Sequence, residues 1–214
     1  MSLKFKPKKS FDKTKRPTDD IHPALIAQII DLGSHFKKDF TTGEIATWKD
    51  GNPIIMQEIY VTFEFPTQMF VYEEGKDPQP AWVSKRYSVS RNEKSALYEL
   101  LKAANCLKSD LSELAGRIVM VEVGSTNTGN PKIVGVTAAK KKILVDDEVV
   151  DATSLTLSKG ECIIYEVEDG NNSVYESLPP FIKEMIDQQD SIDSYKATQK
   201  APEADDSSDE QVEY

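Results

Sequence analysis

Aromatic and basic side chains lie on the polar faces of two segments that alternate like β-strands. Tyr60 falls opposite the apolar face of residues 53–65, and Trp82 shares the outward face of residues 82–90 with Arg86. Sequence-neutral binding of single-stranded nucleic acid uses aromatic rings that stack on bases and cations that bind phosphates. These residue types therefore predict a nucleic-acid surface, for which the candidates are Trp48, Tyr60, Trp82, Lys85, Arg86, Lys132 and Lys140.

Each candidate also has a purely structural explanation. An aromatic residue in a strand packs in the core or against a neighbouring strand roughly three times as often as it stacks on a ligand. Lys85 falls on the same side of the strand alternation as the inward-facing residues Val83 and Tyr87. Lys140 begins a run of three lysines, which is common on surface loops. Lys132 lies in a hairpin that either clamps a nucleic-acid backbone or is only a turn. The sequence leaves both explanations open.

The formal net charge of −10 at pH 7 is unevenly distributed along the chain. Residues 1–20 are rich in lysine and contain Pro7 and Pro17, which predicts a flexible basic arm. From Ala201 onward there is no basic residue, and residues 191–214 predict a disordered acidic tail. The middle of the chain is acidic as well. A DNA-binding surface must therefore be a local patch, because the field of the whole protein repels DNA.

The residues that enzymes commonly use are sparse or badly spaced. There is no Gly-rich phosphate loop and no G-x-S-x-G, and the only histidines are His22 and His35. Cys106 and Cys162 form no metal-type cluster, and we expect both to be reduced, although a long-range disulfide stays open. Residues 146–148 form an acidic triplet, which we weigh at about one chance in ten as the metal site of a nuclease against a turn. We therefore expect no enzymatic activity, no cofactor and no metal site.

Hydrophobic periodicity predicts a chain rich in β-strands with few helices. Residues 22–40 fit either a short helix or a buried strand, and the pattern does not decide between them. Strands are expected at residues 44–48, 53–65, 68–72, 82–90, 117–123, 131–138 and 162–167. A helix is expected from an N-cap at Ser90 to Cys106, with further helices at residues 110–114 and 181–188. No segment is apolar for long enough to span a bilayer.

The order of these elements predicts the fold class. If residues 22–31 form the first strand, several strands with one helix inserted among them have the layout of an OB-type five-stranded Greek-key barrel. We therefore expect a mostly β protein with a C-terminal helix and disordered termini. The barrel and its C-terminal extension occupy residues 21–190 in this interpretation.

Four short motifs follow one another along the chain. They are residues 30–34 (IDLGS), residues 83–90 with 93–97 (VSKRYSVS and EKSAL), residues 114–117 (LAGR) and residues 177–182 (SLPPFI). Their order and spacing resemble those of a group of bacteriophage OB-fold single-stranded DNA-binding proteins, over roughly residues 20–190. The resemblance implies binding of single-stranded DNA without strong sequence preference during phage DNA replication or recombination.

The same resemblance implies partners for the acidic tail. In such proteins the tail docks replication proteins such as a polymerase or helicase and competes with DNA for the binding groove, whereas a merely solubilising tail is about equally compatible with the composition. The tail residues concerned are Asp205, Asp206, Asp209, Glu210, Glu213 and Tyr214. A phage-encoded protein of this kind acts in the host cytoplasm with no membrane partner, and homo-oligomerisation stays open. The alternative function is an OB-like protein–protein adaptor without DNA-binding activity, which the acidic middle of the chain favours.

Overall fold

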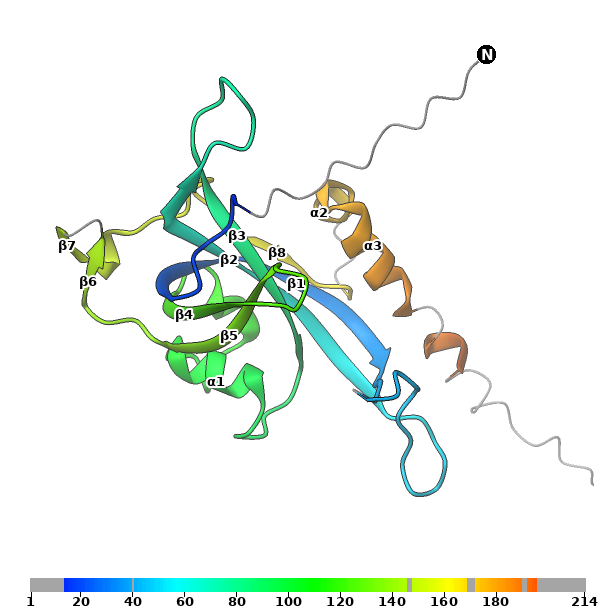
Figure 1. Ribbon diagram of the computed structural model, residues 1–214. Coiled ribbons are helices and arrows are strands. Elements are labelled where there is room, and N and C mark those ends of the chain that lie inside the picture. Colours follow the sequence, from blue (N-terminus) through cyan, green and yellow to red (C-terminus); the bar gives the residue numbers. More distant parts are fainter. Residues whose placement is uncertain (1–13, 40, 146–147, 169–171, 190–191, 196–214) are drawn as a thin grey trace, which may run out of the picture.

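The computed structural model describes residues 14–39, 41–145, 148–168, 172–189 and 192–195. Within these ranges the protein is mostly β, which confirms the expected class (Figure 1). None of the helices in the described ranges is long and apolar enough to cross a membrane.

The described elements are mostly strands up to Tyr165 and helices after it. The strands are β1 (Ile21–Phe36), β2 (Ile55–Phe70), β3 (Gln79–Ser88), β4 (Ile118–Ser125), β5 (Pro131–Ala138), β6 (Lys142–Val145), β7 (Glu148–Asp151) and β8 (Ile163–Tyr165). The helices are α1 (Ala96–Ala103), α2 (Asn172–Ser177) and α3 (Pro180–Asp187), with short 3-10 turns at η1 (Leu111–Leu114) and η2 (Ala152–Ser154).

The main sheet is antiparallel and has the strand order β3-β2-β1-β4-β5. β1 is long enough to pair with β2 along most of its length and with β4 through residues 21–25. The sheet curls until β3 approaches β5, where Lys85 Nζ donates to the carbonyl oxygen of Ile133 at 3.4 Å. β8 adds a short parallel strand to β1, and β6 and β7 form a separate hairpin that projects from the sheet (Figure 1).

The inner faces of the curled sheet enclose the main core. The alternation of residues 53–65 predicts this inner face, because successive side chains of a strand point to opposite faces. The β2 residues Ile59, Val61, Phe63 and Phe65 are each at most 2% exposed. Helix α1 packs Leu97, Leu100 and Leu101 against the same core.

Helix α1 begins later than the capping-box pattern predicts, so the assignment of Ser90 as its N-cap is wrong. Ser95 is the N-cap, and its Oγ accepts the N–H of Tyr98 at 3.2 Å. The residues between the two serines form a turn, in which the carbonyl of Asn92 accepts the N–H of Ser95 at 2.8 Å. The Ser95 hydroxyl also donates to the carbonyl of Ser90 at 2.9 Å, so the two serines act together to position the helix.

Three further strand predictions change in the structure. Residues 22–40, which fitted a helix or a strand, form the strand β1 up to Phe36. Residues 53–65 and 68–72 do not form two strands, because β2 continues through both, with a register shift between Phe65 and Met69. Residues 44–48 form only isolated bridges within the β1–β2 connection.

Residues 14–20 contact the sheet, although the sequence predicts a flexible arm over residues 1–20. The N–H of Val123 on β4 donates to the carbonyl of Asp20 at 2.9 Å. The Ser125 hydroxyl donates to an Asp19 carboxylate oxygen at 2.6 Å, and this hydrogen bond lowers the pKa of Asp19. Residues 1–13 of the predicted arm lie outside the described residues.

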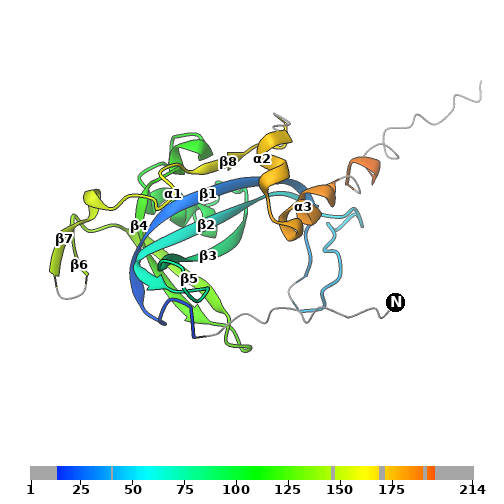
Figure 2. The same cartoon turned by 90° about the horizontal axis from the view of Figure 1, so that it is seen from above.

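The C-terminal segment, defined here as the described part of residues 172–195, packs on the outer side of β1 and β2 (Figure 2). Its helix α3 lies where residues 181–188 predict one. It forms a second core with β1 and β8, whose buried members are Ile30, Leu32, Tyr165, Leu178, Ile182 and Ile186. The motifs at residues 30–34 and 177–182 therefore pack against each other, although they are far apart in the sequence.

Removing the Tyr87 hydroxyl should stabilise the protein. Tyr87 is 2% exposed, and its Oη has no hydrogen-bond partner within the part of the chain that the structure describes. An unsatisfied buried hydroxyl costs about 1–3 kcal/mol, so Tyr87→Phe should raise the free energy of unfolding by about 1 kcal/mol. Tyr175→Phe is the matched control, because its hydroxyl donates to Asp187 at 2.6 Å and its loss should be destabilising. Urea unfolding of both variants measures whether the free energy of unfolding rises in Tyr87→Phe and falls in Tyr175→Phe.

Candidate nucleic-acid interface

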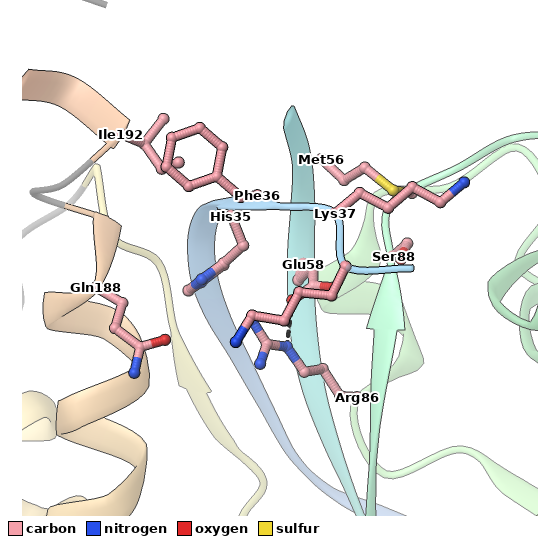
Figure 3. A pocket seen from close by; sticks show the side chains of 10 residues that line it. His35, Phe36, Lys37, Met56, Glu58, Arg86, Ser88, Gln188 and Ile192 are labelled. Atoms are coloured by element: carbon pink, nitrogen blue, oxygen red, sulfur yellow. Dashed lines mark ion pairs between the residues drawn. The ribbon is translucent and has the colours of Figure 1, made fainter. Parts of the chain in front are cut away.

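A cationic groove lies where the end of β1 meets β2, β3 and the C-terminal segment. Its volume is about 570 Å³. It is lined by His35, Phe36, Lys37, Lys38, Met56, Glu58, Arg86, Ser88, Gln188 and Ile192. Figure 3 shows the Arg86–Glu58 pair on one side of the groove, and Gln188 and Ile192 of the C-terminal segment on the other. Four stretches of chain that are distant in sequence therefore build one concave surface.

The positive charge of the groove comes from Lys37, Lys38 and Arg86. Both lysines are exposed, and Arg86 forms an ion pair with Glu58 on the neighbouring strand. Burial lowers the pKa of His35 and so favours its neutral form, an effect that its Nε2–H hydrogen bond to the Leu32 carbonyl at 2.8 Å only partly opposes. The groove therefore combines exposed cations with one partly neutralised guanidinium, which suits an anionic ligand.

Lys37 and Lys38 are positioned by the hairpin that connects β1 to β2. Backbone hydrogen bonds tie its two arms together, from the Lys37 N–H to the Ile54 carbonyl and from the Ala46 N–H to the Lys37 carbonyl, both at 2.8 Å. Asp39 shapes the turn by accepting the N–H groups of Thr41 and Thr42, and these two hydrogen bonds lower its pKa. The hairpin therefore holds the two lysines at the mouth of the groove.

Trp48 lies at the far end of the same hairpin and is 62% exposed. Its backbone forms a tight turn, in which the Trp48 N–H donates to the Asn52 carbonyl at 2.8 Å and the Gly51 N–H donates to the Trp48 carbonyl at 3.0 Å. Gly51 adopts a φ of +88°, which a residue with a Cβ rarely does. The turn presents a large aromatic ring to solvent on the hairpin that also carries Lys37 and Lys38.

Tyr60 and Arg86 are direct cross-strand partners on the outer face of β2 and β3. Tyr60 is not an open ring, because the C-terminal segment partly covers it. The ring of Phe181 contacts it edge-on, with centroids 6.1 Å apart and planes at 71°. Sequence parity places Tyr60 correctly outside the main core, but only the tertiary structure shows what packs on that face.

Trp82 lies farther along the same outer face and is engaged on two sides. Its Nε1–H donates to Glu64 Oε2 at 3.0 Å, and Lys159 Nζ lies 4.7 Å from its ring centroid. Glu64 is only 1% exposed, because it also accepts the N–H and the hydroxyl of Ser158, each at 2.7 Å. The loop around Ser158 therefore covers this end of the outer face.

The remaining candidate lysines do not join Tyr60 and Arg86. Lys85 points inward, as its parity predicts, and donates to Ile133 O where β3 approaches β5. Burial lowers the pKa of Lys85. Lys132 lies on β5 opposite Gly124, and Lys140 follows the end of β5, both exposed. The structure therefore separates the predicted residues. Arg86 lines the groove and has Tyr60 as its cross-strand partner, Trp48 lies on the hairpin, and Lys132 and Lys140 lie on the β5 side.

Several groove residues escaped the sequence analysis. Lys37 and Lys38 were detectable as a lysine pair shortly after the apolar run that ends at Leu32, whereas nothing local marks Gln188 or Ile192. The tail candidates Asp205, Asp206, Asp209, Glu210, Glu213 and Tyr214 lie outside the described residues, as do two members of the acidic triplet, Asp146 and Asp147. Cys106 and Cys162 are both free thiols, and burial raises the pKa of Cys162 to about 11.

Gly33 explains how the C-terminal segment reaches β1. Its φ is +75°, and a Cβ built on it would lie 1.4 Å from Gln189 Oε1. The same Gln189 oxygen accepts the N–H of Ser34 at 3.2 Å, and the Asp31 carboxylate accepts the Gly33 N–H at 2.9 Å. The glycine of the IDLGS motif therefore serves both a left-handed turn and the close approach of the C-terminal segment.

Gly33→Ala should cost more than an alanine at a glycine with similar backbone geometry. A left-handed conformation costs a residue with a Cβ about 1–2 kcal/mol. At Gly33 the Gln189 side chain must also move, which forfeits a hydrogen bond that contributes about 1 kcal/mol. Gly116→Ala is the control, because its φ is +68° and no described atom lies within 4 Å of the added Cβ. Equal losses of unfolding free energy in urea would contradict the contact with Gln189.

No protein family, curated protein sequence or solved structure matches this chain.

Proposed function

We propose that this protein binds single-stranded DNA without strong sequence preference through an OB-type barrel. The strand order and the approach of β3 to β5, with α1 inserted between β3 and β4, support that assignment, because they match a partly open five-stranded Greek-key barrel. In OB barrels the face of the second and third strands and the loop between the first two strands bind oligonucleotides. The motif resemblance supports a role in phage DNA replication or recombination.

The observation that carries the proposal is a cationic groove together with an exposed tryptophan on the hairpin that leads from it. Lys37, Lys38 and Arg86 gather at the end of β1 and β3, although the chain as a whole has a net charge of −10. Trp48 lies on the hairpin that holds the two lysines. Cations that bind phosphates and rings that stack on bases are the two contacts that sequence-neutral binding requires.

The proposed mechanism is non-covalent and strongly dependent on salt. Phosphates release counterions when they bind Lys37, Lys38 and Arg86, so affinity falls as the salt concentration rises. The overall negative charge opposes binding, and the acidic tail competes for the same cations. In this proposal the tail also docks a replication protein such as a polymerase or helicase.

Fluorescence anisotropy of a labelled oligo-dT tests the proposal directly. The full chain and a chain ending at Lys200 are each titrated across a salt series, with a duplex of the same length as the comparison. We expect binding that falls with salt, exceeds binding to duplex and becomes tighter when residues 201–214 are removed. Absence of binding by both chains at low salt would exclude the DNA-binding function.

An OB-like protein–protein adaptor is the second candidate function. Two observations favour it: Phe181 packs on Tyr60, and Lys159 together with Glu64 engages Trp82, so parts of the outer face already have partners within the chain. The adaptor function predicts no binding to oligo-dT by either chain. The same titration therefore distinguishes the two candidates.

A further inference from the structure

Phe181 is unusual among the apolar residues of α3 because its ring is accessible. It is 52% exposed, whereas Ile182 and Ile186 on the same helix are 1% and 7% exposed. A large aromatic side chain normally contributes more to stability when it is buried. The position of Phe181 therefore needs an explanation other than packing in the second core.

The backbone around Phe181 is held firmly although the ring is exposed. Leu178 and Ile182, which flank it, are 4% and 1% exposed in the second core. Pro179 is the N-cap of α3 and Pro180 occupies its first turn, where the fixed φ of proline suits a helix start. The ring is therefore presented from a rigid position, so that little conformational entropy is lost when a ligand contacts it.

The Phe181 ring is linked to the cationic groove through Tyr60. It contacts Tyr60 edge-on, and Tyr60 is the cross-strand partner of Arg86, which lines the groove. Glu58, the ion-pair partner of Arg86, lies two residues before Tyr60 on the same face of β2. Gln188 and Ile192, from the same C-terminal segment as Phe181, line the other side of the groove (Figure 3).

We infer that Phe181 is a base-stacking residue, and that the C-terminal segment completes the DNA-binding groove by adding an aromatic ring beside its cations. This inference rests on the proposed function and deepens it by assigning one more contact residue and a second side of the groove. The DNA strand passes from the Phe181–Tyr60 pair over Arg86 toward Lys37 and Lys38. The structural alternative is that Phe181 only covers Tyr60.

The charges near Phe181 determine which part of a nucleotide contacts it. Glu184 lies one helical turn after Phe181 and is exposed, so it repels a phosphate at that position. Lys183 does not offset it, because its Nζ is bonded to the Glu176 carboxylate at 2.8 Å. The base therefore contacts the ring while the phosphates face Arg86 and the two lysines. The contribution of Phe181 to affinity should accordingly be independent of salt.

The test compares Phe181→Leu and Phe181→Trp with wild type in the oligo-dT titration across salt. Loss of a stacked base lowers affinity by about fivefold to 150-fold, so we expect a loss in this range for Phe181→Leu. The slope of log affinity against log salt should stay unchanged, because no phosphate contact is lost. Phe181→Trp should bind as tightly as wild type. Tyr98→Leu on α1 is the matched control and should leave affinity unchanged.

A second measurement keeps the inference testable if Phe181→Leu disturbs folding. The wild-type chain is photo-crosslinked to an oligo-dT that carries 5-iodouracil, and the crosslinked peptides are identified by mass spectrometry. We expect a crosslinked peptide that contains Phe181. Tight binding by wild type with neither a crosslink there nor a loss in Phe181→Leu overturns the inference and leaves the proposed function standing. No binding by wild type overturns both.

Discussion

Reversing the charges of Lys37 and Lys38 together should lower the affinity for oligo-dT by about 100-fold or more at low salt. Each lysine that contacts a phosphate adds about 0.7 to the magnitude of the salt slope for a single strand, so Lys37→Glu/Lys38→Glu should reduce that slope by about 1.4. The reversed charges also repel the DNA and thereby reduce the association rate. Anisotropy titrations at several salt concentrations give both quantities.

The control for this variant must carry the same change in net charge. Lys102→Glu/Lys108→Glu is suitable, because both lysines are exposed on or just after α1 and neither lines the groove. We expect the control to lose much less affinity and to keep the wild-type salt slope. Equal losses in the two double variants would mean that only the net charge matters and that the groove is not the binding site.

Ile182→Ala should detach the C-terminal segment while the main core stays folded. Ile182 is 1% exposed in the second core, and truncation of a buried isoleucine to alanine costs about 2–5 kcal/mol. The C-terminal segment has its own small core, so the substitution lowers the free energy of opening this segment more than that of unfolding the whole protein. Hydrogen exchange should therefore accelerate in α3 and residues 192–195, with little change in β2 and β3.

The matched control removes the same atoms from an exposed position. Ile45 in the β1–β2 hairpin is 48% exposed, so Ile45→Ala should change the free energy of unfolding by less than about 0.5 kcal/mol. If exchange accelerates equally in β2 and α3 of Ile182→Ala, the C-terminal segment and the curled sheet unfold as one unit. That outcome would contradict the separation into two cores.

These two variants also separate the roles of the two sides of the groove. The lysine pair acts through charge and should leave stability nearly unchanged, since both side chains are exposed. Ile182 acts through packing, and it affects DNA binding only by positioning Phe181, Gln188 and Ile192. Loss of affinity in Ile182→Ala with an unchanged salt slope would be the signature of that indirect effect.

The alternation of β2 was sufficient to predict which of its side chains face the core. A strand has a period of two, so Ile59, Val61 and Phe63 must share a face whatever the rest of the chain does. The sequence likewise predicted α3 as a helix at residues 181–188, directly after Pro179 and Pro180. Local periodicity fails where two solutions are equally good, as at Ser90 and Ser95, because both serines can cap a helix and the intervening turn decides.

The sequence by itself thus determined the β-rich class, the inner face of β2, the position of α3 and the presence of a helix between β3 and β4, although not where that helix begins. Only the tertiary structure decided that the C-terminal segment packs on β1, that it partly covers Tyr60, and that Gln188 and Ile192 meet Arg86 across a groove. The physical reason is that periodicity reports whether a side chain is buried but not which distant segment buries it. The absence of a side chain at Gly33, for example, is needed partly because Gln189 packs against it, and the local sequence does not show that contact.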